Sequence, residues 1–144
     1  MKDVKDVRYR GSLLPEQPTI EQVREASGDY VAIALEVMRA IVDRYERNPD
    51  YGWIDTKIHL VSGRDFSEEE LIRGRRTVYG WIQGRGLEAL VGHARWFRNH
   101  LQGPEIENLL QQMDCMIREI LGRIRSVREH NCGHVFFYMT PEGE

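Results

Sequence analysis

The sequence lacks the apolar runs that mark membrane and exported proteins. No stretch approaches the ~20 consecutive apolar residues of a membrane-spanning helix, and the first twelve residues, MKDVKDVRYRGS, contain no apolar core of a signal peptide. The two cysteines, Cys115 and Cys132, are too few for a disulfide framework. Cys115 lies in a helical pattern, where we expect it to be a small buried apolar residue. These absences predict a cytoplasmic protein with no membrane partner.

An excess of basic charge is also missing. The formal net charge is −3 and the pI is about 6.0, whereas nucleic-acid-binding domains usually carry a basic field. One basic cluster exists, at Arg73, Arg75 and Arg76, but three glutamates at 68–70 precede it. We expect a solvated turn whose charges compensate one another, and no nucleic-acid partner.

The motifs of common catalytic sites are absent as well. The sequence has no GxSxG elbow, no P-loop and no CxxC pair, and its five histidines do not form a metal-ligand spacing such as HExxH. No metal and no cofactor are therefore predicted. His93 lies four residues before Phe97, which favours packing over catalysis.

The residues that are present predict a mostly helical domain. Of 144 residues, 41% are hydrophobic and 30% charged, which is ordinary for one globular domain with a real core. Residues 1–18 are polar and read as a loosely ordered arm, and the domain proper covers 19–144. The capping box TIEQ predicts a helix that starts at Thr19 and ends before Asn48–Pro49. Gly28 either breaks this helix in two or lies within it.

Two further long helices and several extended segments follow. Residues 50–66 read as an extended loop or short hairpin, and SEEE at 67–70 as a second capping box. Helical spacing predicts helices over about 76–101 and 104–130, with Gly103–Pro104 between them and Asn131 and Gly133 as a C-terminal cap. HVFFYM at 134–139 then predicts a strand and TPEG a turn. Because that strand has no evident partner, we expect the chain to be a piece of something longer.

Arg85 is the strongest candidate functional residue. It lies between Gly84 and Gly86, and Gly80 is close by; each glycine costs a helix about 1 kcal/mol against alanine. Its helix face is shared by large apolar groups and small residues, so we expect the face to be buried: Val78, Trp81, Ile82, Glu88, Ala89 and Gly92. A buried arginine needs a partner or a ligand. Either it forms an internal salt bridge, to Glu88 or to another helix, or it points into a cavity with the glycines leaving room around it.

Four other residues are candidates for substrate binding. Tyr79 and Gln83 share one helix face, where a tyrosine is more often core. Trp81 and Trp53 either stack on a sugar ring or pack in the core. We expect Trp53 to be the more accessible of the two, because it lies in the extended loop. Asp55 and Lys57, also in that loop, are expected to pair with each other.

Three segments, taken in order, resemble a known family. They are DYGWIDTKIHLVSG (50–63), YGWIQGRGLEAL (79–90) and CGHVFFYMTPEG (132–143). Together they resemble the N-terminal part of the N-acylglucosamine 2-epimerase and cellobiose 2-epimerase superfamily, over about residues 30–144. The resemblance implies an (α/α)6 barrel of twelve helices, of which residues 19–144 supply the first helical hairpins with short β-hairpin loops.

The resemblance also implies an activity. These enzymes open the ring of a small sugar and move a proton at C2 through an enediolate, with histidines of later helices as acid and base. The arginine of the Q-x-R pattern, which maps onto Arg85, binds the sugar oxygens and steadies the enediolate charge. Residues 1–144 alone are then expected to be inactive, and a homodimer is left open.

Two alternatives come from other classes. One is an (α/α)6 sugar hydrolase of the unsaturated-uronyl type, which needs catalytic carboxylates, with Asp55 or Glu88 as candidates. The other is a non-enzymatic helical domain that associates with a partner.

Overall fold

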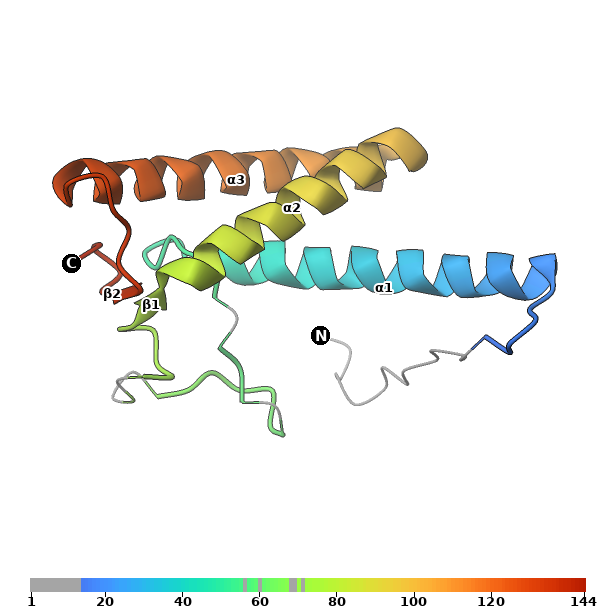
Figure 1. Cartoon of the computed structure of the whole chain (residues 1–144), viewed down its shortest axis with the longest axis horizontal. Helices are drawn as coiled ribbons and strands as arrows, with labels where there is room; N and C mark the ends of the chain where they lie inside the picture. Colours follow the sequence, from blue (N-terminus) through green and yellow to red (C-terminus); the bar gives the residue numbers. More distant parts are fainter. Residues whose placement is uncertain (1–13, 56, 60, 68–69, 71) are drawn as a thin grey trace. The chain divides into compact units, whose positions relative to one another are not determined.

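The computed structural model describes residues 14–55, 57–59, 61–67, 70 and 72–144, and this part of the chain is mostly helical, as predicted (Figure 1). The helices are α1 (Ile20–Glu46), α2 (Gly80–His100) and α3 (Pro104–His130), and the strands are β1 (Val78–Tyr79) and β2 (Tyr138–Met139). The chain divides into two compact units, Met1–Met38 and Arg39–Glu144, with the boundary inside α1. Most of the predicted polar arm, residues 1–13, lies outside the described residues.

The predicted capping box begins α1. The backbone N–H of Gln22 donates to Thr19 Oγ1 at 3.2 Å, and the N–H of Thr19 donates to Gln22 Oε1 at 2.9 Å. The helix runs on through Gly28, so a break at that residue is excluded. At its other end Asn48 donates its side-chain amide to the carbonyl of Arg44 at 2.9 Å, and Pro49 prevents continuation.

The core of the second unit lies largely between α2 and α3, and Figure 1 shows α3 returning along α2 after a tight turn. Gly103, with φ of 121°, makes this turn, and Pro104 opens α3 at a position where no backbone N–H is needed. The buried apolar residues of the two helices are Leu90, Ala94 and Phe97 of α2 and Leu109, Leu110, Met113, Met116, Ile120 and Val127 of α3. At the far end of α3, Gly133 has φ of 87° and donates its N–H to Arg128 O at 2.8 Å, which confirms the predicted cap.

The partner of the C-terminal strand comes from the segment before α2. β2 pairs antiparallel with β1, with Val78 opposite Met139 and Tyr79 opposite Tyr138. Val78 and Met139 are buried, while Tyr138 is exposed. The prediction of a strand over all of 134–139 was too long, and the helix predicted from Arg76 begins at Gly80 instead, because residues 78–79 are used in this pairing.

The segment between α1 and β1 is irregular and folds back on itself once. Ile58 and Asp65 form an isolated antiparallel bridge, and Gly63, with φ of 64°, lies at the tip. The N–H of His59 donates to Arg64 O at 2.9 Å within this turn. Of the two alternatives predicted for 50–66, the described residues follow the loop, with a single bridge where a hairpin would have paired strands. The predicted capping box at 67–70 includes residues that lie outside the described part.

Candidate functional site

The loop after α1 is fixed against α2 by Ile54 and Gln83. The side-chain amide of Gln83 accepts the N–H of Ile54 at 2.8 Å and donates to the carbonyl of Ile54 at 3.0 Å. Both residues are buried, and Gln83 is only 1% exposed. Gln83 therefore acts as a hydrogen-bonding partner for the loop backbone, in place of a neighbouring strand. Because its side chain is buried, its amide is not accessible to a sugar hydroxyl.

Trp53, next to Ile54, is part of the core. It is 1% exposed, and its indole N–H donates to the carbonyl of Pro141 at 2.8 Å. On one side the guanidinium of Arg123 lies 6.0 Å from the centre of the ring system. The expectation that Trp53 is accessible in its loop is wrong, because the loop is packed inward between α2 and the C-terminal turn.

Four charged residues form a closed ring beside this loop, which we call the ion-pair ring: Arg44, Asp55, Asp65 and Arg75. Arg44 bonds Asp55 at 2.8 Å and Asp65 at 2.6 Å; Arg75 bonds Asp55 at 3.0 Å and Asp65 at 2.7 Å. Arg44 also donates its Nε–H to the carbonyl of Asp55 at 2.9 Å. The ring ties the C-terminal turn of α1 to two separate points of the segment that leads to β1.

The ring perturbs the ionisation of its members. Burial raises the pKa of Asp65, but the hydrogen bond and charge of Arg44, together with Arg75, outweigh it, and the net pKa is lowered. Burial lowers the pKa of Arg75, but its bonds to Asp55 and Asp65 outweigh this, and the net pKa is raised. Because the Asp55 side chain is only 2% exposed, its charge depends on Arg44 and Arg75 in place of water.

Asp55 and Lys57 do not form the expected ion pair. Asp55 uses Oδ2 for the two arginines and accepts the backbone N–H of Lys57 on Oδ1 at 3.1 Å. The ammonium of Lys57 instead donates to the carbonyls of Gly74 and Thr77. Burial lowers the pKa of Lys57, Asp55 opposes that change and Arg75 adds to it. Both residues therefore hold the loop together.

The basic cluster before β1 is compensated by carboxylates, but within the described residues only Arg73 pairs with one of the preceding glutamates. Arg73 pairs with Glu70 at 2.7 Å, three residues earlier. Arg75 pairs with the two aspartates of the ion-pair ring.

Arg85 is solvent-exposed, so the prediction of a buried arginine is wrong. Its side chain is 77% exposed and lies 3.4 Å from a carboxylate oxygen of Glu88, itself 74% exposed. The same side of α2 carries further exposed residues at helical spacing. We call this surface the α2 open face, and it consists of Trp81, Gly84, Arg85, Glu88, Gly92, Arg95 and Trp96.

The glycines of α2 divide into two groups. A Cβ at Gly80 would lie 2.3 Å from the backbone oxygen of Phe136, and one at Gly86 would lie 2.3 Å from Ile54 Cδ1. A Cβ at Gly84 or Gly92 would meet nothing within 4 Å. Gly80 and Gly86 therefore allow a neighbouring segment to pack closely against α2. Gly84 and Gly92 leave the α2 open face without a side chain near Arg85.

The structure does not gather the predicted site residues into one place. Of the five, Arg85 and Trp81, which is 55% exposed, share the α2 open face. Gln83 and Trp53 are in the core. Tyr79 lies in β1, half-buried, with its hydroxyl 3.5 Å from the carbonyl of Ile72 and its ring edge-on to Phe137.

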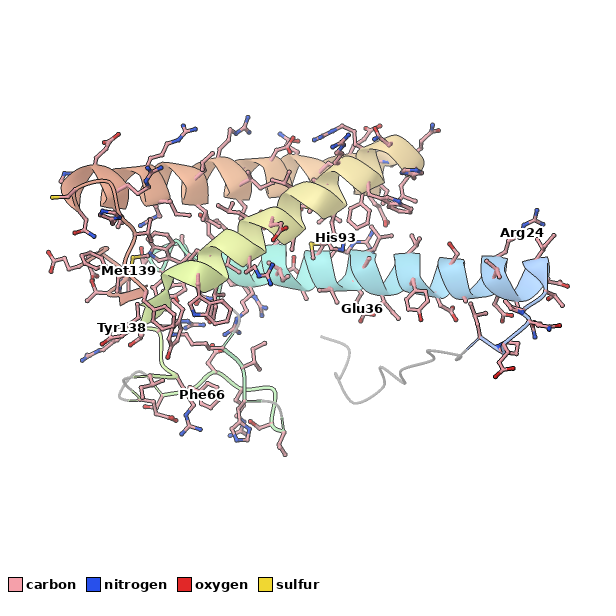
Figure 2. The ribbon with its side chains drawn as sticks, viewed as in Figure 1. Arg24, Glu36, Phe66, His93, Tyr138 and Met139 are labelled. Atoms are coloured by element: carbon pink, nitrogen blue, oxygen red, sulfur yellow. The ribbon has the colours of Figure 1, made fainter. Side chains whose placement is uncertain are left out.

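The histidines of the helices bond to their own backbone. His93, His100 and His130 each place Nδ1 within 2.7–2.8 Å of the carbonyl four residues earlier. His93, labelled in Figure 2, also lies 5.9 Å from the ring of Phe97, which agrees with a packing role. Within the described residues, no group of three or more histidine, cysteine or acidic side chains is placed to hold a metal ion.

Cys115 is exposed, in contrast to the buried position expected from its helical pattern. Its thiol lies 3.4 Å from Glu119 Oε1, and this hydrogen bond raises the pKa of the thiol. Glu119 also accepts the hydroxyl of Tyr45 at 2.6 Å.

The two carboxylates proposed for a hydrolase are unlike each other. The charge of Asp55 is compensated by the arginines of the ion-pair ring, and Glu88 is on the α2 open face beside Arg85.

None of the helices in the described part of the chain combines the length and apolar character that crossing a bilayer requires.

No family model, no curated protein and no solved structure matches the chain. Its function has to be inferred from its own residues and motifs.

Proposed function

We propose that the α2 open face is the carbohydrate-binding wall of a sugar 2-epimerase or isomerase of the N-acylglucosamine 2-epimerase type. The observation that carries the proposal is the accessible guanidinium of Arg85, which stands on α2 with an exposed indole, Trp81, one turn before it. The Q-x-R pattern at 83–85 is the second support. The larger (α/α)6 barrel belongs to the proposal, with α2 and α3 as one of its helical pairs.

The residues of this face suit the chemistry of a ring-opened sugar. Removal of the proton at C2 places negative charge on oxygen, and a guanidinium is a type of group that stabilises such charge. Glu88, 3.4 Å from Arg85, offers an acceptor for a sugar hydroxyl on the same helix face. Gly84 and Gly92 add no side chain that would hold a ligand away from the helix.

The acid and base are not assigned to residues of α2 or α3. His93 and His100 bond to helix carbonyls, and His100 also stacks on Trp96 with ring centroids 4.5 Å apart. Under the proposal, histidines from another part of the complete enzyme complete the site, and the 144-residue chain binds sugar without turning it over.

Binding is tested by titrating the 144-residue chain with N-acetylglucosamine and with cellobiose while recording the indole N–H signals by NMR. The signal of Trp81, assigned with Trp81→Phe, should shift, and Arg85→Ala should weaken the apparent affinity. Arg125→Ala removes another exposed arginine, on α3, and should leave the titration unchanged. If Arg85→Ala and Arg125→Ala behave alike, the proposed role of Arg85 is wrong.

Catalysis is tested with the intact gene product in D2O. An epimerase that acts through an enediolate replaces the hydrogen at C2 with deuterium, which is seen by NMR of the recovered sugar. The exchange should fall by about 100-fold or more in Arg85→Ala, as for loss of an oxyanion-stabilising donor. Release of an unsaturated uronic acid without C2 exchange would establish the hydrolase alternative instead.

A helical interaction domain is the second candidate, favoured by the exposed apolar groups of α2. Trp81, Val91 and Trp96 are 55%, 50% and 41% exposed on one helix, and exposed apolar patches often mark protein contacts. Sedimentation velocity separates the two candidates. Self-association that is abolished by Trp96→Ala and unaffected by sugar would support the interaction domain over the epimerase.

A further inference from the structure

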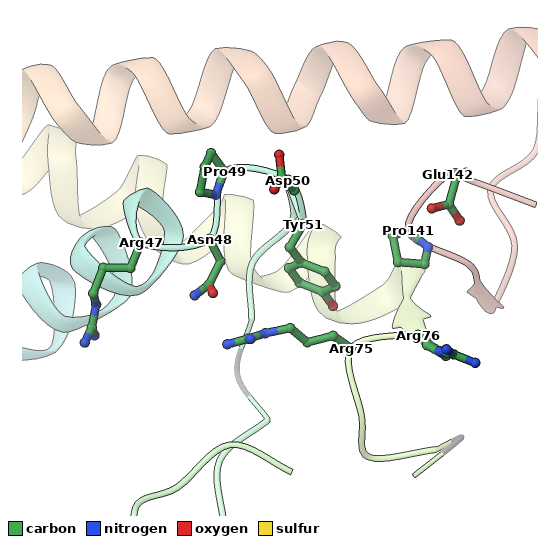
Figure 3. A pocket seen from close by; sticks show the side chains of 9 residues that line it. All are labelled: Arg47, Asn48, Pro49, Asp50, Tyr51, Arg75, Arg76, Pro141 and Glu142. Atoms are coloured by element: carbon green, nitrogen blue, oxygen red, sulfur yellow. The ribbon is translucent and has the colours of Figure 1, made fainter. Parts of the chain in front are cut away.

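A hollow of about 360 Å³ lies at the C-terminal end of α1, away from the α2 open face (Figure 3). It is formed where the loop after α1, the residues before β1 and the C-terminal turn come together, and its walls include Asn48, Tyr51, Arg76 and Glu142. We call it the Tyr51 hollow. Its volume lies at the lower end of the range for small-molecule sites.

The hydroxyl of Tyr51 is the feature that points to a ligand. Tyr51 is only 7% exposed, and buried tyrosine hydroxyls usually have a hydrogen-bond partner. No described residue donates to this hydroxyl or accepts from it, and no buried side-chain polar atom in the described part of the chain is left unsatisfied. Its oxygen must therefore reach the open space, and Figure 3 shows the ring projecting into the hollow between Asn48 and Pro141.

The pKa of the Tyr51 hydroxyl is raised, which keeps the hydroxyl protonated. Burial raises the pKa of its hydroxyl, the charge of Asp55 raises it further, and Arg75 and Arg44 oppose the change only in part. The hydroxyl therefore keeps its proton over the whole physiological range and can donate to an oxygen of a bound molecule.

The charges around the hollow balance, which argues against an anionic ligand. Arg75 already bonds the two aspartates of the ion-pair ring. The remaining cations, Arg47 and Arg76, are matched by two lining carboxylates, Asp50 and Glu142. Donors and acceptors are thus both available, while no surplus positive charge is left for a phosphate.

We propose that the Tyr51 hollow binds a neutral polyhydroxylated molecule of the hexose class. A sugar hydroxyl donates and accepts at once, so it matches a wall that mixes guanidinium, carboxylate, amide and phenol groups. The C–H faces of a sugar match the apolar surfaces of Tyr51, Pro49 and Pro141, which also line the hollow. This site shares no residue with the α2 open face, and its proposed ligand does not depend on the function proposed above.

The test is a titration of the 144-residue chain with glucose, N-acetylglucosamine and glucose 6-phosphate, followed by saturation-transfer NMR. The two neutral sugars should bind, and Tyr51→Phe should weaken them by about 2- to 10-fold, the effect of one hydrogen bond. Tyr45→Phe is the matched control, because the Tyr45 hydroxyl bonds Glu119 outside the hollow, and it should leave the affinity unchanged.

Glu142→Gln tests whether the Tyr51 hollow prefers neutral or anionic ligands. Loss of this carboxylate should weaken neutral sugars, whereas an anion site would bind glucose 6-phosphate more tightly after the same change. The proposal is overturned if the phosphate sugar binds best, if Tyr51→Phe matches Tyr45→Phe with both variants folded, or if no neutral sugar binds. Loss of binding in Arg85→Ala but not in Tyr51→Phe would leave the α2 open face as the sugar site and remove this one.

Discussion

The side-chain amide of Gln83 and the backbone of Ile54 are joined by two hydrogen bonds, of 2.8 and 3.0 Å, in a fully buried setting. This pairing replaces the neighbouring strand that the loop backbone does not have. It explains why an irregular segment is able to enter the core, since buried backbone groups must be satisfied. It also turns Gln83 away from the α2 open face, although Arg85 is only two residues further along the chain.

Replacing Gln83 by alanine should strongly destabilise the fold. The substitution leaves the N–H and C=O of Ile54 buried without partners, and each such group costs about 1–3 kcal/mol. We expect the free energy of unfolding in urea to fall by about 2 kcal/mol or more. The control is Gln112→Ala, because Gln112 bonds Glu46 on an exposed surface. Equal losses in the two variants would contradict the structural role of Gln83.

Alanine substitutions of two glycines in α2 should have opposite effects. Gly84→Ala adds a methyl group where nothing lies within 4 Å, so higher helix propensity should stabilise the protein by about 0.5–1 kcal/mol. Gly80→Ala forces Cβ toward the carbonyl of Phe136, 2.3 Å away, and should lower the thermal midpoint. Calorimetry on both variants measures the difference. A stabilising Gly80→Ala would show that the segment before β2 does not approach the start of α2 as described.

The helical part of the fold could be predicted because its signals are local. The TIEQ capping box, the Gly103–Pro104 turn and the cap at Gly133 depend on residues that are close in sequence. The pairing of β1 with β2 could not be predicted, since each strand has two residues and the paired residues lie 59 and 61 positions apart. A strand this short carries no periodicity of its own.

The environment of Arg85 was mispredicted for a different reason. An apolar face with small residues normally indicates burial, yet here the opposite face of α2 is the buried one, with Gln83, Leu90 and Phe97. The sequence does not indicate that Gln83 faces the core, because its hydrogen-bonding partner Ile54 is distant in the chain. Likewise, the aspartates and arginines of the ion-pair ring are distributed over three segments of polar sequence, and no local pattern distinguishes them from solvated charges.

Removing Asp55 should cost far more than removing an exposed partner of a salt bridge. Asp55→Ala leaves Arg44 and Arg75 with Asp65 as their remaining partner in the ring, and that carboxylate is 44% exposed whereas Arg44 is only 13% exposed. Because breaking a buried pair costs about 3–5 kcal/mol, we expect a loss toward the lower end of that range. Arg73→Ala removes the exposed pair with Glu70 and should change stability by less than about 1 kcal/mol. Urea unfolding measures both values. A loss below 1 kcal/mol in Asp55→Ala would mean that solvent or local rearrangement compensates the two arginines.

The ion-pair ring should also make the protein sensitive to acid. Asp65 has a pKa below its ordinary value of 3.8 in the folded protein, because Arg44 and Arg75 together outweigh its burial. A carboxyl whose pKa is depressed by folding contributes its stabilisation above the unfolded pKa and loses it as the pH falls through the lower folded value. Thermal midpoints measured from pH 6 to pH 2 should therefore drop below about pH 4, and Asp65→Asn should flatten this part of the curve. Asp114→Asn removes a carboxylate from the pair with Arg98 and controls for the loss of one negative charge. If the Asp65→Asn curve falls as steeply as that of Asp114→Asn, the acid sensitivity comes from carboxyl groups outside the ring.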